Sequence, residues 1–124
     1  MKADVNTQGT LSLEENLKKS LAEFLILLLF SEREHYIGEL TEELLARSDG
    51  ALSILFPYTA IYRLLERGYI NEVKKRIAPD GRRRQYYQIT EDGIAYLKVL
   101  ESIYDRMTNG IHTVRNARRE KNNG

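Results

Sequence analysis

Apolar positions along the chain follow helical spacing in the first half. The strongest signal is the run of seven apolar residues from Phe24 to Phe30, which follows an acidic, lysine-containing amphipathic segment. Ser12 and Glu15 have the spacing of a capping box, so we expect a helix from Ser12 to about Ser31. Spanning a bilayer takes about 20 residues, so this run predicts a buried helix and no membrane partner.

A second helix is predicted from Tyr36 to Ala46, ended by the turn-forming sequence Ser48-Asp49-Gly50. Its leucines fall on one face and its glutamates mostly on the other, as in a helix that packs on a core by one side. The leucines of this face are Leu40, Leu44 and Leu45.

A third helix is expected from about Ile54 to Arg67, with Ser53 as its N-cap and Gly68 at its end. Pro57 must lie in its first turn, because proline is tolerated there and not in a helix interior. Its apolar stripe consists of Ala60, Ile61, Leu64 and Leu65.

Strand-like spacing begins after Gly68. We expect strands over residues 69–78 and 82–89, joined by a turn at Pro79-Asp80-Gly81. Tyr87 would face the core, whereas Tyr86 would face the other way beside Arg84 and could donate to a phosphate.

A fourth helix is predicted after Thr90, and its apolar residues are separated by 3, 4, 3, 4 and 3 residues. A small domain could not cover such a long stripe, so it predicts dimerisation. The stripe consists of Leu97, Leu100, Tyr104, Met107, Ile111 and Val114. We expect Thr108-Asn109-Gly110 to interrupt the helix, and a frayed basic tail from Arg115.

The predicted fold class is mainly α with a small β-hairpin: a winged helix-turn-helix plus a long C-terminal dimerisation helix. We divide the chain into a disordered N-terminal arm (residues 1–11), a winged helix DNA-binding domain (12–90) and a C-terminal dimerisation helix with a basic tail (91–124).

Net charge is only +1 over 124 residues, which argues against a globally basic DNA-coating protein. Local charge is different, because residues 74–84 hold six basic residues and one acid, a local charge of +5. Such a cluster at a hairpin tip suits phosphates or a narrow minor groove, although a solvated tip is the plainer alternative.

In a winged helix the third helix enters the major groove and the hairpin lies on the backbone or in the minor groove. Arg63 could instead pair with Glu66, and Lys74 or Lys75 could simply face solvent. The residues expected to contact DNA are Tyr58, Thr59, Tyr62, Arg63, Lys74, Lys75, Arg82, Arg83, Arg84 and Tyr86.

Residue types that carry catalysis or bind metals are sparse. There are no cysteines, which fits a cytoplasmic location, and His35 and His112 have no partner at ligand spacing. Glu32 and Glu39 near His35 are expected to be ordinary helix-surface residues. We therefore expect no catalytic residues, no metal and no cofactor.

The segment Gly81 to Gly93, GRRRQYYQITEDG, resembles the wing and following helix start of the PadR-type transcriptional regulators. Tyr58 to Ile70 resembles the recognition helix of that family, and the resemblance covers roughly Leu21 to Leu100. It implies a dimeric repressor that binds a double-stranded DNA operator through two half-sites about one DNA turn apart. The first and last helices would form the dimer, and a small-molecule effector is a further possible partner.

Two segments depart from the family pattern. Ile37-Gly38 stands where relatives have Gly-Tyr, and Leu55-Phe56-Pro57 stands where they often have Gly-Thr-Leu or Ser-Thr-Ile. The chain also has no tryptophan, so the aromatic-ligand pocket of some relatives does not carry over. Alternatives are a winged-helix module for protein–protein interaction and a MarR-like regulator, with an enzyme a distant third.

Overall fold

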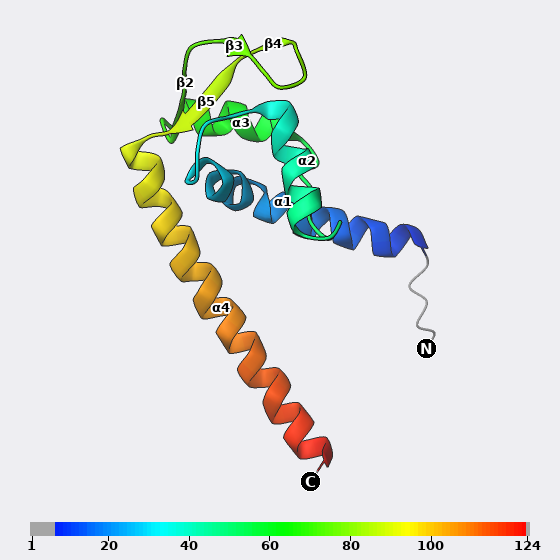
Figure 1. Cartoon of the computed structure of the whole chain (residues 1–124). Helices are drawn as coiled ribbons and strands as arrows, with labels where there is room; N and C mark the ends of the chain where they lie inside the picture. Colours follow the sequence, from blue (N-terminus) through cyan, green and yellow to red (C-terminus); the bar gives the residue numbers. More distant parts are fainter. Residues whose placement is uncertain (1–6, 124) are drawn as a thin grey trace.

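The computed structural model describes residues 7–123, with side chains over 13–122, and confirms the predicted fold class (Figure 1). Three helices come first: α1 (Thr7–Phe30), α2 (Ile37–Arg47) and α3 (Pro57–Glu66), with β1 (His35–Tyr36) directly before α2. The wing follows as β2 (Ile70–Glu72), β3 (Arg76–Ile77), β4 (Arg83–Arg84) and β5 (Tyr86–Ile89). The last element is α4 (Glu91–Asn123), whose first half packs on α1 and whose C-terminal part extends away from the other elements (Figure 1).

Two helix starts differ from the prediction. α1 begins at Thr7 and not at Ser12, so residues 7–11 of the expected arm are helical, and residues 1–6 lie outside the described part. α3 begins at Pro57 with Phe56 as N-cap, so Ser53 does not cap it. Proline fits the first helical position because its missing N–H has no partner to lose there.

α4 is also more regular than its sequence indicated. It continues through Thr108-Asn109-Gly110 and Arg115 to Asn123, so the predicted interruption and frayed tail are wrong. Thr90 does begin it as expected, since its hydroxyl accepts from the Gly93 amide at 3.0 Å. The same hydroxyl donates to the Gly68 carbonyl at 2.6 Å, which ties the start of α4 to the end of α3.

The predicted hairpin is present but divided into two ladders. β5 lies between β1 and β2, both antiparallel to it, while β3 and β4 form a separate two-stranded ladder at the tip. Gln85 stands at the division, where its side-chain amide donates to the carbonyl oxygens of Val73 and Tyr86. This side chain supplies hydrogen bonds where the regular ladder is interrupted.

The main core gathers the apolar faces of all four helices and β5. Its fully buried apolar side chains come from α1, α2, α3 and β2, and they are Ile26, Leu27, Leu40, Ile61, Leu64 and Ile70. Tyr87 joins this core from β5, as predicted. In the described part of the chain, no helix is long and apolar enough to cross a membrane.

His35 links the end of α1 to α2 and is completely buried. Its Nε2 lies 3.0 Å from the Leu29 carbonyl oxygen, and its Nδ1 lies 3.1 Å from Glu39 Oε1. Glu39 also accepts from the Tyr36 amide at 3.3 Å and from Arg33 at 3.2 Å. Glu39 therefore belongs to a hydrogen-bond network around the buried His35. The expectation that it is an ordinary surface residue is wrong.

Candidate nucleic-acid interface

One face of α3 is open to solvent while the other packs in the core. Tyr58 and Tyr62 stand one turn apart with exposed fractions of 71% and 69%, and Thr59 between them is also exposed. Ala60, Ile61 and Leu64 bury the opposite face. Helical periodicity thus leaves a row of hydroxyl-bearing side chains pointing away from the molecule.

Arg63, the fourth predicted contact on α3, is exposed but has a partner that the sequence did not indicate. Its Nη1 lies 3.4 Å from Glu23 of α1, and Arg67 binds the same carboxylate at 3.1 Å. The alternative pairing with Glu66 is not formed. Glu23 is far away in sequence and becomes a neighbour only because α1 packs against α3.

The six cations of the wing separate into two groups. Arg76 pairs with Glu34 at 2.7 Å and Arg84 pairs with Asp80 at 2.5 Å. The remaining four cations are exposed and form no ion pair with any residue in the described range; they are Lys74, Lys75, Arg82 and Arg83.

The Asp80–Arg84 pair lies at the wing tip. The Arg84 guanidinium, followed by the backbone N–H of Arg82, holds the pKa of Asp80 below its usual range. Asp80 is therefore ionised at neutral pH and offsets part of the positive charge of the tip.

Tyr86 was predicted to lie exposed beside Arg84, but it is buried. It is only 4% exposed and packs edge-on against Tyr36, with ring centroids 5.4 Å apart. The Arg76 guanidinium covers its ring at 3.5 Å. The alternation of β5 is as expected, but Tyr36 and Ala78 form a second small core on that side.

A hollow of about 160 Å³ lies where α2, α3 and the wing meet. It lies between the first turn of α2, the first turn of α3 and the wing. Its lining residues are Tyr36, Ile37, Gly38, Tyr58, Arg84, Gln85 and Tyr87. Of these lining residues, only Tyr58 and Arg84 were predicted site residues. Ile37 and Gly38 had been noted only as a departure from the family pattern.

The predicted dimerisation stripe is partly used by the chain itself. Leu97 is only 5% exposed in the chain's own core and Leu100 packs against that core, so Leu97 is not available to a partner. Tyr104 contacts Phe24 of α1 with ring centroids 5.3 Å apart, and it remains partly exposed. The exposed remainder of the stripe is Met107, Ile111 and Val114.

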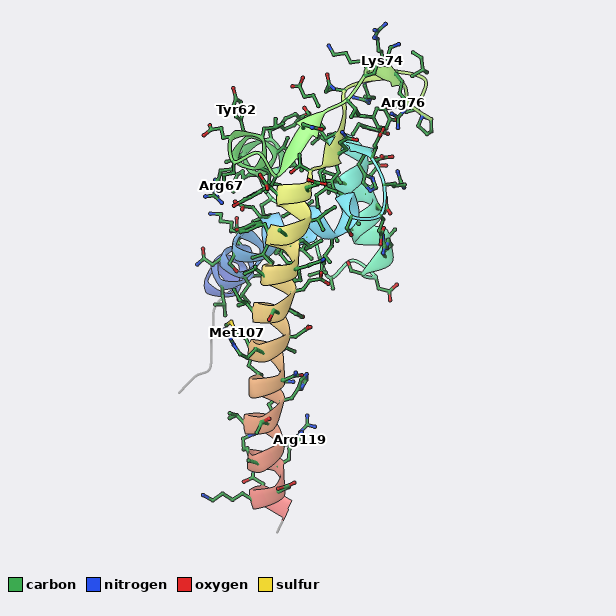
Figure 2. All side chains as sticks on the ribbon, turned by 90° about the vertical axis from the view of Figure 1, so that its left-hand side faces the viewer. Tyr62, Arg67, Lys74, Arg76, Met107 and Arg119 are labelled. Atoms are coloured by element: carbon green, nitrogen blue, oxygen red, sulfur yellow. The ribbon has the colours of Figure 1, made fainter. Side chains whose placement is uncertain are left out.

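These surfaces lie apart along the length of the molecule (Figure 2). Figure 2 shows Tyr62 and Lys74 at one end and Arg119 of α4 at the other, with Met107 between them. The α3 face and the wing therefore share one end, and the exposed apolar stripe of α4 lies away from it.

Comparison with known proteins agrees with this architecture. A transcriptional regulator from Clostridium thermocellum is 28% identical over 76% of this chain and 89% of its own, with a TM-score of 0.64. A PadR family transcriptional regulator from Eggerthella lenta shares the fold at 20% identity and a TM-score of 0.67, over 85% of this chain and 90% of its own. A PadR-like transcriptional regulator from Bacillus cereus does so at 22% identity and a TM-score of 0.65, over 77% of this chain and 91% of its own.

The search of curated proteins found no match. The family model of the PadR-like transcriptional regulators matches residues 26–99, which is more than half of the chain and includes α2, α3 and the wing. The chain therefore belongs to the PadR-like family of transcriptional regulators, and it is a DNA-binding winged helix protein of that family.

Proposed function

We propose that the chain is a dimeric repressor that binds a double-stranded operator, with α3 in the major groove and the wing on the adjacent backbone or in the minor groove. One observation carries the proposal. The exposed hydroxyl face of α3 and the unpaired cations of the wing lie at the same end of the molecule, where Figure 2 shows Tyr62 and Lys74.

The α3 face has the chemistry needed for reading a groove. Tyr58, Thr59 and Tyr62 bring hydroxyl groups that both donate and accept hydrogen bonds, and base edges present both kinds of partner. Their burial against the protein is small, so binding would not require α3 to leave its core.

The wing has the chemistry needed for binding the backbone. Arg82 and Arg83 are exposed, carry full charges and have no carboxylate partner among the described residues, so a phosphate would meet no internal competitor. Each phosphate that they neutralise would release condensed counterions, which makes binding steeply dependent on salt.

The exposed side chains on the distal half of α4 support the proposal of a dimer. Beyond Tyr104 the helix presents apolar side chains that its own domain leaves exposed, and a groove between α1 and α4 is lined by Leu17, Phe24 and Ile103. A second copy of the chain would cover both surfaces. The two α3 helices of this dimer would meet half-sites about 34–36 Å apart.

Fluorescence anisotropy with DNA from upstream of the gene, against scrambled DNA, tests the proposal over a series of salt concentrations. We expect tight, sequence-dependent binding by the wild type. Arg82→Ala with Arg83→Ala should weaken it and lower the salt slope by about two for each subunit bound.

Lys98→Ala with Arg106→Ala is the matched control, since it removes the same charge from exposed positions of α4. If operator affinity falls by the same factor in both double variants, the assignment of the wing to DNA is wrong. Binding that ignores sequence, or no binding at all, would favour the alternative of a protein–protein interaction module.

A further inference from the structure

The exposed face of α3 begins with an aromatic ring that was not among the predicted site residues. Phe56 is the N-cap of α3 and is 55% exposed, two positions before the exposed Tyr58. Its neighbours Leu55 and Pro57 are both partly buried, so in this segment the exposure is concentrated on the Phe56 ring. A phenyl ring cannot donate or accept a conventional hydrogen bond, and its exposure to water is unfavourable. More than half of an apolar side chain is therefore open to a partner at the start of the recognition helix.

The backbone holds this ring in a fixed place. Pro57 occupies the first helical position, where its restricted φ suits the helix. Proline also disfavours a helical conformation in the residue before it, and Phe56 is accordingly non-helical, with φ −128° and ψ 72°. The Ala60 amide donates to the Phe56 carbonyl oxygen at 3.1 Å, which ties the residue to the first turn of α3. Binding through Phe56 would therefore require little ordering of the backbone.

The ring lines a hollow of about 290 Å³ between α1 and α3 that carries positive charge. Thr59 and Arg63, three and seven positions after Phe56, line the same hollow, and Lys19 Nζ lies 5.3 Å from the ring centroid. Glu23 is the one carboxylate among the lining residues, and it already accepts from Arg63. The surroundings of the ring therefore favour a polyanion over an acidic or a neutral apolar partner.

We propose that the Phe56 ring contacts the C5 methyl group of a thymine, which makes one T·A pair a part of each half-site. The proposal rests on the proposed function, in which α3 lies in the major groove, and names a base that the helix reads. The N-terminal residues of a recognition helix contact base edges. The thymine methyl is the apolar group that base pairs present there, so it is the partner that an apolar ring selects.

Deoxyuridine in place of thymidine tests the contact without changing the protein, because it removes the methyl group and keeps the hydrogen-bonding pattern of the pair. The probe is the shortest duplex from upstream of the gene that the wild type binds in preference to scrambled DNA. Symmetry-related thymines are replaced one pair at a time, and affinity is measured by fluorescence anisotropy. At one pair we expect affinity to fall about fourfold for each methyl removed. A scan in which no thymine methyl matters would overturn the proposal.

Phe56→Ala assigns the methyl contact to the ring. This variant should bind the thymine duplex more weakly than the wild type and should no longer distinguish it from the uracil duplex. Phe56→Leu keeps an apolar side chain at the N-cap and should retain part of the preference for thymine. Urea denaturation should give both variants the free energy of unfolding of the wild type, because the replaced ring is mostly exposed. If Phe56→Ala is destabilised, a thymine preference that is unchanged in a stable Phe56→Leu would overturn the proposal.

Thr59→Ser is the matched control, since it removes a methyl group that lines the same hollow and keeps the hydroxyl. It should retain the preference for thymine over uracil. A preference that is lost in Thr59→Ser and kept in Phe56→Ala would overturn the proposal, because Thr59 would then read the methyl.

The losses in Phe56→Ala also separate a base contact from a contact with the DNA backbone. An equal loss on the thymine and uracil duplexes, with the difference between the two duplexes kept, would mean that the ring does not read the base. That result would overturn this proposal and leave the proposed function intact, as judged by the effect of the Arg82 and Arg83 substitutions. A wild type that binds no DNA in a sequence-dependent way would overturn both.

Discussion

Gly93 occupies a position where any side chain would collide with the backbone. A Cβ there would overlap the Tyr69 carbonyl oxygen and lie 2.7 Å from Ile89 Cγ1. That carbonyl cannot move freely, because it accepts from the Thr90 amide at 3.0 Å. We expect Gly93→Ala to lower the free energy of unfolding by about 3 kcal/mol, measured by urea denaturation.

Gly110 provides the contrast within the same helix. A Cβ there would have no heavy atom within 4 Å, so Gly110→Ala should raise stability by about 0.5–1 kcal/mol at the same protein concentration. Equal effects of the two substitutions would contradict the close approach of α4 to Tyr69.

His35 is a buried residue that joins the end of α1 to α2 by hydrogen bonds. Replacing it by alanine would leave the Leu29 carbonyl and the Glu39 carboxylate without the ring that lies between them. We expect His35→Ala to lower the free energy of unfolding by about 2–4 kcal/mol. His112→Ala, at an exposed position of α4, is the control, and a similar loss there would argue against the network.

At the scale of the element, Asp80 is the single acid among the basic residues 74–84 of the wing and offsets part of their charge. Because the pKa of Asp80 is lowered in the folded chain, its pair with Arg84 contributes above the unfolded value near 3.8 and is lost as pH falls below that value. The wing should therefore bind DNA with little dependence on this group between about pH 6 and 8.

The Arg82 backbone amide donates a hydrogen bond to Asp80 at 3.0 Å. Asp80→Asn removes the charge but keeps an oxygen that can accept this bond. Operator affinity at low salt should rise about threefold because Arg84 is released toward DNA, and anisotropy titration measures it. Asp105→Asn, on an exposed part of α4, should leave affinity unchanged. Weaker binding by Asp80→Asn would mean that the pair serves to shape the wing.

At the scale of the whole molecule, the proposed dimer depends on the exposed half of the α4 stripe. Met107→Glu with Ile111→Glu would place carboxylates in the proposed subunit interface, so we expect sedimentation velocity to show a monomer where the wild type is a dimer. Loss of the dimer should also lower operator affinity, because the two half-sites would then be bound separately.

Arg106→Glu changes charge on the other side of α4 and should remain dimeric. A wild type that stays monomeric over the micromolar range would exclude the dimer. A double variant that still dimerises would place the interface elsewhere.

The sequence by itself determined the order of the four helices and the hairpin, and most of the residues that the helices bury. Periodicity, Pro57 and the glycines that end helices act within a few residues, so they can be interpreted without the fold. The side of β5 that carries Tyr87 followed from strand alternation in the same way.

Only the tertiary structure decided what covers each remaining face. Tyr86 was assigned to DNA because alternation turns it away from the main core, but β1 pairs with β5 and brings Tyr36 beside it. Glu23 reaches Arg63, and the hollow brings Gly38 to Tyr87, for the same reason. These neighbours are distant in sequence and meet through the packing of whole elements, which no local pattern specifies.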